Sequence, residues 1–227
     1  AVHAPELFSD DHILDLTLQD EASLEHSLSE LQRVCDVTRQ LKDFFPNTRR
    51  PVIVLNAGGF SSNAFLDAKE ITKRYETLEA SLSRLNQDGV EIIIQTMPPF
   101  PWHFGGQSHH NLFVAPEQIR QFCIRTNYRL CFDVSHTMMA CSYYNWNLTD
   151  ATRLIGPYIA HMHVVDALGI DGEGVQIGQG DVDFIELVDD LSKLAPGVMF
   201  LPEVWQGHKN HGEGFWGALE FLEKKGL

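Results

Sequence analysis

The chain repeats one unit, in which a short apolar run is followed by a loop rich in Gly, Pro and Asn and then by a helical pattern. Continuous apolar runs such as PVIVLNAGG and VEIIIQTMPP are typical of strands covered on both faces, as in a parallel sheet. The starts of successive runs lie between 30 and 50 residues apart. The predicted strands are Val2–Pro5, Val52–Asn56, Glu91–Gln95, Arg129–Asp133, Ile159–Asp166 and Met199–Glu203.

Between these runs, apolar residues recur on one stripe, which predicts helices. One helix is expected to open at Pro116, because proline is favoured in the first turn. The others are predicted over residues 24–41, 75–85, 184–194 and 215–222. Strands alternating with helices imply right-handed crossovers and a parallel sheet, either doubly wound or closed into a barrel.

The loops decide between these two architectures. Those that follow the strands are long and polar, over residues 96–115, 134–148, 167–181 and 204–214, whereas those that precede the strands are short. Long loops after nearly every strand favour a (β/α)8 TIM barrel, because a doubly wound sheet concentrates them at one switch point. We therefore predict an α/β fold in which residues 1–227 form a single TIM-barrel domain.

The chain has fewer predicted βα units than a complete TIM barrel. Six predicted strands are two fewer than eight, and at roughly 38 residues a unit a full barrel would exceed the typical ~250 residues. The chain opens on a strand and closes on the helical pattern GFWGALEFLEKKGL. We expect the first two βα units to be absent, so that the chain supplies strands 3 to 8. It would then be a piece of a longer polypeptide, with further domains as possible partners, or a barrel with an unusual opening.

The net charge of the chain limits the classes of partner that it is expected to bind. With 17 Lys and Arg against 31 Asp and Glu, the net charge is −14, which argues against nucleic acid and is compatible with carboxylates around a metal. No apolar run approaches the roughly 20 residues of a membrane span, and no secretory signal pattern is visible at the start. The four cysteines form no C-x-x-C pair, so we expect buried free thiols in a cytoplasmic protein without membrane contact.

Each predicted strand ends in a polar side chain, and in a barrel these ends converge on one spot. A mixture of Asp, Glu and His without thiolate suits a divalent metal such as Mn²⁺, Mg²⁺, Co²⁺ or Zn²⁺. The strand-end residues are His3, Asn56, Gln95, Asp133 with the nearby His136, His163 with Asp166, and Glu203.

Several motifs resemble the xylose-isomerase-like barrel superfamily: VHAP, DVSH, HMHVVD, IGQGD and the PE of FLPEVW. That superfamily contains sugar-phosphate isomerases and epimerases, inosose dehydratases and barrel-type AP endonucleases. The longer stretches QTMPPFPWHFGGQ and PEVWQGHKNHGEGFW resemble a barrel domain found in larger polypeptides of sialic-acid-type (nonulosonate) sugar synthesis.

The resemblance implies one divalent metal bound by Asp133, His163 and Glu203. The fourth ligand of such epimerases is a Glu on the fifth strand, but here that position is Gln95. The two glutamates serve as paired acid and base in the family, and a glutamine cannot take up a proton. Either another group replaces the lost base, or the reaction needs only one, or the domain does not catalyse.

Further roles are expected around this metal. His136, three residues after Asp133, suits proton transfer together with Glu203. The multi-metal endonucleases need a His where this chain has Asn56, which together with the charge disfavours DNA repair. The residues expected to bind substrate are His3, Asn56, Trp102, Asp166 and His208.

Two functions remain open. The first is a divalent-metal-dependent isomerase or epimerase that transfers a proton next to a carbonyl of a sugar or sugar derivative. The second, suggested by Gln95, is a non-catalytic or regulatory sugar-binding module within a multidomain nonulosonate enzyme.

Overall fold

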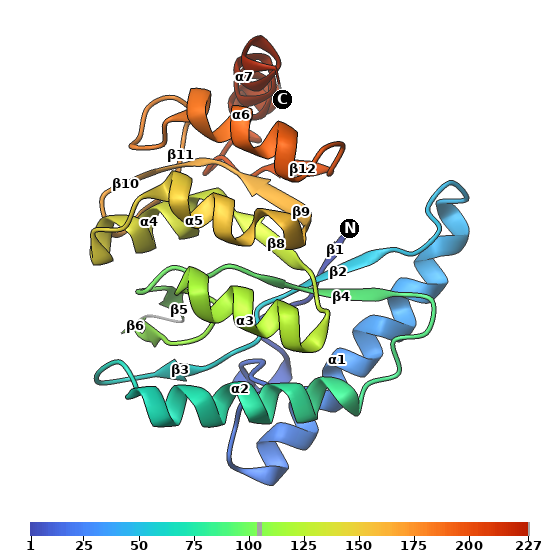
Figure 1. Cartoon of the computed structure of the whole chain (residues 1–227). Coiled ribbons are helices and arrows are strands. Elements are labelled where there is room, and N and C mark those ends of the chain that lie inside the picture. Colours follow the sequence, from blue (N-terminus) through green and yellow to red (C-terminus); the bar gives the residue numbers. More distant parts are fainter. Residues whose placement is uncertain (104–105, 227) are drawn as a thin grey trace.

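A curved six-stranded parallel sheet forms the centre of the computed structural model (Figure 1). The structure describes residues 1–103 and 106–226, apart from the side chains of Asp10 and of residues 102–107. The strands follow the order β1-β2-β4-β8-β9-β12, with β1 and β12 at the edges. They are β1 (Val2–His3), β2 (Val52–Leu55), β4 (Glu91–Gln95), β8 (Leu130–Asp133), β9 (Ile159–Val164) and β12 (Phe200–Pro202).

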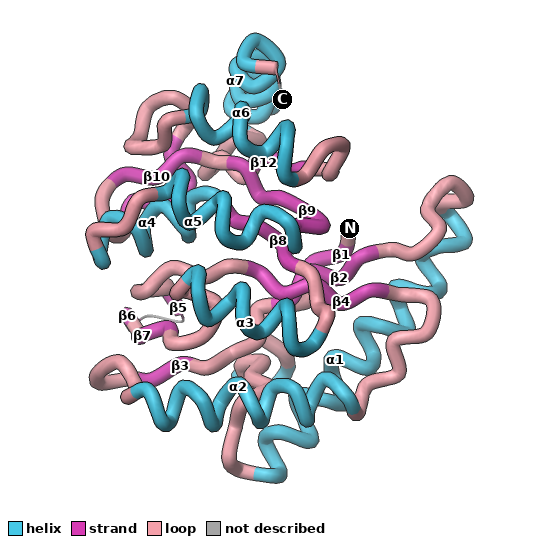
Figure 2. The backbone as a smooth tube through the Cα atoms, viewed as in Figure 1, coloured by secondary structure: helices cyan, strands magenta, loops and turns pink. Residues whose placement is uncertain are grey.

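Helices lie beside the sheet along its width (Figure 2). Helix α3 packs against α5, and α5 packs against α6. The α-helices are α1 (Glu21–Leu41), α2 (Ala68–Ser83), α3 (Pro116–Thr126), α4 (Val134–Tyr144), α5 (Leu148–Ile155), α6 (Phe184–Leu194) and α7 (Lys209–Lys225). Short 3-10 turns are η1 (Ser9–Asp11), η2 (Lys42–Phe44) and η3 (Gly156–Tyr158). No helix in the described ranges is long and apolar enough to cross a membrane.

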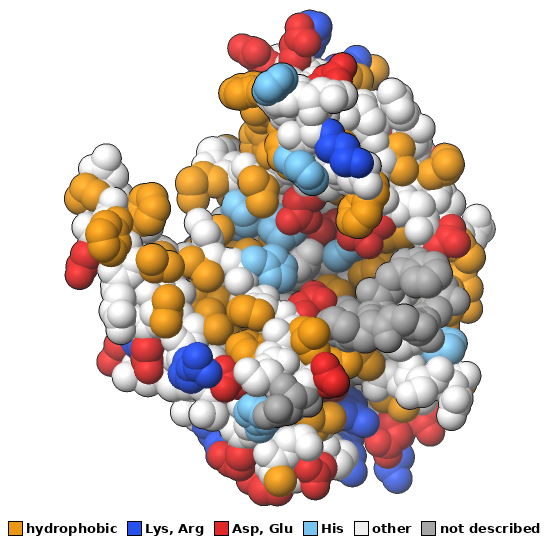
Figure 3. Space-filling view, turned by 180° about the vertical axis from the view of Figure 1, so that it is seen from behind, with side chains coloured by type: hydrophobic (Ala, Val, Ile, Leu, Met, Phe, Trp, Pro, Cys, Tyr) orange, Lys and Arg blue, Asp and Glu red, His pale blue; other side chains and the backbone are white. Residues whose placement is uncertain are grey.

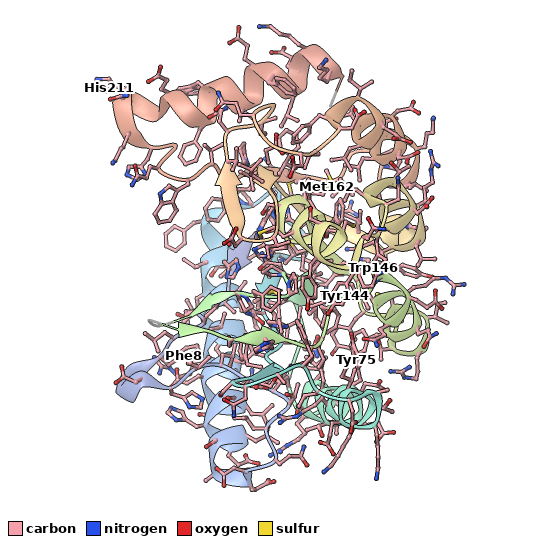
Figure 4. The ribbon with its side chains drawn as sticks, turned by 90° about the vertical axis from the view of Figure 1, so that its left-hand side faces the viewer. Phe8, Tyr75, Tyr144, Trp146, Met162 and His211 are labelled. Atoms are coloured by element: carbon pink, nitrogen blue, oxygen red, sulfur yellow. The ribbon has the colours of Figure 1, made fainter. Side chains whose placement is uncertain are left out.

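Alternate residues of the sheet enter two apolar layers. Ile53 and Ile94 belong to the main core, which also contains Tyr75 and Met162 (labelled in Figure 4). Val54 and Ile93, on the opposite face, form a smaller cluster with Val52 and Cys131. The sheet is therefore buried on both faces, as the continuous apolar runs predicted. The four cysteines are buried free thiols, also as predicted.

The edge of the sheet at which the parallel strands end carries three short antiparallel pairs. They are β3 (Phe60–Ser61) with β7 (His109–His110), β5 (Trp102–His103) with β6 (Gly106–Gln107), and β10 (Asp166–Leu168) with β11 (Gly172–Val175). These pairs belong to the long loops after β2, β4 and β9. They extend the edge of the sheet at which the strand-end side chains lie.

The predicted TIM-barrel class is confirmed as an open, parallel part of such a barrel, and two local predictions are wrong. Residues 134–148 were expected to be a loop, but α4 begins directly after β8 because the Asp133 side chain accepts a hydrogen bond from the His136 backbone N–H and caps the helix. The fifth strand was expected to reach Asp166, but β9 ends at Val164 and Asp166 begins β10.

Candidate metal centre

Asp133, His163 and Glu203 meet where β8, β9 and β12 end. One ligand atom from each lies within 4.8 Å of those from the other two. The Nδ1 atom of His163 is 3.2 Å from Glu203 Oε2 and 3.6 Å from Asp133 Oδ2. Asp133 pairs with His163 in the sheet, so the two side chains share a face. Histidine and acidic side chains gather in a hollow on the face shown in Figure 3.

Gln95 and His3 extend this cluster across the sheet. The amide nitrogen of Gln95 lies 2.9 Å from Asp133 Oδ2 and 3.2 Å from His163 Nδ1. Its amide oxygen lies 3.0 Å from His3 Nε2, and the rings of His3 and His163 are stacked. A line of polar contacts thus runs from β1 through β4 and β8 to β9 and Glu203.

Opposite charges compensate each other in the buried centre. Burial alone would raise the pKa of the Asp133 carboxyl, but His136 and His163 outweigh it and hold this pKa well below its usual range. Burial would lower the pKa of His163, but its contacts with Asp133, Cys131 and Glu203 raise this pKa to about 12. The carboxylates around His163 therefore favour its protonated form.

His136 lies beside Asp133 and is held from both sides. Its Nδ1 is 2.9 Å from the Thr96 carbonyl oxygen, and its Nε2 is 3.0 Å from Glu173 Oε1. Burial would lower its pKa, but the charges of Asp133 and Glu173 raise it to about 10. No role was predicted for Glu173 from the sequence. Its only sequence signal is its place in a long loop after a strand.

Four other predicted residues lie apart from the Asp133–His163–Glu203 cluster. Asn56 bonds with Glu6 and His110 in a neighbouring network. Asp166 is fully buried and accepts four backbone N–H bonds. His208 is exposed at the start of α7, and the side chain of Trp102 lies outside the described residues. Their roles in substrate binding remain predictions.

The residues present fit a divalent cation. Two carboxylates and an imidazole nitrogen, without a thiolate in the set, are ligands that suit Mn²⁺, Mg²⁺, Co²⁺ or Zn²⁺. Because metal ligands must be deprotonated, a cation here would replace the proton of His163 and take over its charge balance.

Comparison with known proteins fits this arrangement. The family model described as "Xylose isomerase-like TIM barrel" matches residues 1–225. The chain belongs to this family. A relative in sequence, an uncharacterized protein of Methanocaldococcus jannaschii, is 24% identical over 127 residues. The matched segment covers 55% of this chain and 40% of that protein, so the match reaches less than half of the relative's length.

Solved structures share the barrel fold of the xylose isomerase-like family. A D-tagatose 3-epimerase-like protein superposes with a TM-score of 0.69 at 21% identity, covering 100% of this chain and 79% of its own. The D-allulose 3-epimerase of Methylomonas sp., in complex with D-allulose, gives a TM-score of 0.64 at 12% identity, covering 93% and 73%. At these identities the likeness establishes the fold.

Proposed function

We propose that the chain is a divalent-metal-dependent isomerase or epimerase domain acting on a sugar or sugar derivative. One observation carries this proposal: the ligand atoms of Asp133, His163 and Glu203 lie within 4.8 Å of one another where three parallel strands end. The family match and the similarity to epimerase structures support it.

Asp133, His163 and Glu203 would hold the metal, with the Gln95 amide oxygen as a fourth donor. When bound, a divalent cation supplies positive charge that stabilises the charge developing on a sugar carbonyl oxygen when the neighbouring carbon loses its proton. Glu203 would move that proton, because its side chain is 32% exposed whereas that of Asp133 is fully buried. His136 is the second candidate for proton transfer, and Glu173 holds its ring in place.

The test combines metal analysis with turnover. Mn²⁺ binding and epimerisation of ketoses such as D-tagatose and D-allulose are measured for the wild type and for Glu203→Gln. We expect Glu203→Gln to lower turnover by about 10²–10⁴-fold, the usual contribution of a general acid or base. Glu220→Gln, an exposed position on α7, is the matched control and should leave turnover unchanged. Wild-type protein that binds no divalent metal and turns over no sugar would contradict the proposal.

Gln95 favours a second candidate function, a sugar-binding module that does not catalyse, within a larger nonulosonate enzyme. The amide in place of a carboxylate removes one of the two proton-transfer groups. Gln95→Glu separates the two functions. If the chain is a non-catalytic module that lost its activity with this carboxylate, Gln95→Glu should gain both Mn²⁺ affinity and turnover. If the wild type already turns over a sugar, the chain is not such a module.

A further inference from the structure

We propose that His3 is a positioning residue that turns the carbonyl oxygen of Gln95 toward the metal site. The inference rests on the proposed function, because it concerns the fourth donor of that site. It assigns a task to β1, the edge strand that contributes none of the three residues Asp133, His163 and Glu203.

The backbone fixes which nitrogen of the His3 ring can donate a hydrogen bond. Its Nδ1 lies 2.8 Å from the carbonyl oxygen of Ala4, which can only accept a hydrogen bond. In a neutral imidazole, Nδ1 is then the atom that carries the hydrogen, and Nε2 is left as an acceptor. That acceptor lies 3.0 Å from the side-chain amide of Gln95.

An acceptor at this place selects one orientation of the Gln95 amide. The two orientations exchange Oε1 and Nε2 and occupy the same space. With the oxygen toward His3, two acceptors would face each other across 3.0 Å. With the –NH₂ group toward His3, it donates to Nε2, and the carbonyl oxygen takes the other position, beside Asp133 and His163. This orientation is the reverse of the one described above, in which the amide nitrogen faces Asp133.

That position suits a metal donor. The amide atom there is 2.9 Å from Asp133 Oδ2 and 3.2 Å from His163 Nδ1. Two oxygens so close repel each other unless a cation or a donated proton lies between them. Gln95 is 4% exposed, so water has little access to relieve this repulsion. A divalent cation would do so in place of the proton on His163, and the orientation imposed by His3 would favour its binding.

The experiment is a double-mutant cycle with Mn²⁺ binding, measured by titration calorimetry, as the readout. The proteins are the wild type, His3→Phe, Gln95→Glu and the double variant. Phenylalanine keeps a ring that can stack on His163 but has no acceptor for the amide. In Gln95→Glu both terminal atoms are oxygens, so no orientation has to be chosen.

We expect His3→Phe to weaken Mn²⁺ binding by about 10–100-fold when residue 95 is Gln, as is usual for partners that orient a ligand. In the Gln95→Glu background the same change should alter affinity by no more than about twofold, the scatter of independent sites. The thermal midpoint of each protein reports folding, and His3→Ala serves as a second variant should His3→Phe fail to fold.

The outcomes separate this inference from the proposed function. Unchanged affinity in His3→Phe, or an equal loss in both backgrounds, overturns the role of His3 and leaves the metal site standing. Binding by Gln95→Glu but not by the wild type also overturns the role of His3, because Gln95 is then no ligand. Absence of Mn²⁺ binding in the wild type and in Gln95→Glu overturns both proposals.

Discussion

Asp166 is a carboxylate whose surroundings are those of a structural anchor. Its Oδ1 accepts hydrogen bonds from the N–H groups of Ala167 and Val182, and its Oδ2 accepts from those of Gly178 and Gly180. The side chain is therefore fully buried without an unpaired oxygen. The four bonds join the start of β10 to the loop before α6.

Replacing Asp166 tests this anchoring role. Asp166→Asn puts an amide –NH₂ group against two backbone N–H donors, so we expect a loss of about 2–4 kcal/mol in the free energy of unfolding. Urea unfolding monitored by circular dichroism measures it. Asp171→Asn, on an exposed residue of the same loop, should change stability by less than about 0.5 kcal/mol. Equal stability of the two variants would argue against the anchor.

Asp15 is a second buried carboxylate, and its hydrogen bonds are with residues outside the proposed metal site. It accepts hydrogen bonds from Thr17 and from the backbone N–H of Gly59. Gly58 has φ +88°, and a Cβ there would lie 2.2 Å from Asp15 Oδ1, so this carboxylate packs directly on the loop after β2. Burial raises the pKa of the Asp15 carboxyl despite these bonds.

This raised pKa predicts a pH dependence of stability. A group whose pKa is higher in the folded state stabilises most below its unfolded pKa, about 3.9, and loses this contribution as pH rises through the folded value. The wild type should therefore lose stability relative to Asp15→Asn as pH rises from about 4 toward neutrality. Urea midpoints of both proteins across this range give the slope of stability against pH. The hydrogen bonds that asparagine alters should shift its whole curve by a constant amount and leave the slope unchanged. Parallel curves would refute the prediction.

At the scale of elements, β8 and α4 share Asp133. One of its oxygens caps α4 by accepting from the His136 backbone N–H, and it also accepts from the Ser135 hydroxyl. The other oxygen faces Gln95 and His163. The residue that starts the helix is therefore also a proposed metal ligand.

Two substitutions separate these tasks. Asparagine caps helices as well as aspartate does, so Asp133→Asn should keep a higher thermal midpoint than Asp133→Ala, although both lose the carboxylate charge and Mn²⁺ affinity. Asp133→Ala should lose Mn²⁺ affinity and also about 1 kcal/mol or more of stability, because the cap is gone. Calorimetric titration and thermal unfolding give the two readouts. Loss of the fold in Asp133→Asn would contradict the separation.

The elements differ in how well the sequence predicts them. The strands and α1, α3 and α6 could be predicted because their apolar runs and stripes are regular. Helix α4 could not, because it is buried on most sides, from Val134 to Cys141, and so lacks the polar face that marks a helix. The left-handed turn at Asn210–Gly212, which precedes the regular part of α7, also has no periodic signal. Figure 4 labels His211 in this turn.

At the scale of the whole molecule, the convergence of strand ends was predictable and the contacts within the site were not. Parallel strands bring Asp133, His163 and Glu203 to one edge whatever their loops do. Asn56 directly follows β2, as the sequence predicts. Only tertiary packing determines that its side chain contacts Glu6 and His110. Glu173 contacts His136 from a two-stranded ribbon whose register the sequence does not reveal.

The net charge leads to a final prediction about partners. The motifs of this chain also resemble barrel-type endonucleases, but Asn56 stands where those enzymes are expected to have a His ligand, and the charge of −14 repels phosphates. We expect no binding to a duplex with an abasic site, even with Mn²⁺ and at 50 mM salt, where any electrostatic contribution is large. Fluorescence anisotropy over a salt series measures this. Binding that weakens steeply with salt would reveal a basic surface and overturn the prediction, since releasing counterions from DNA requires several phosphate contacts by Lys or Arg.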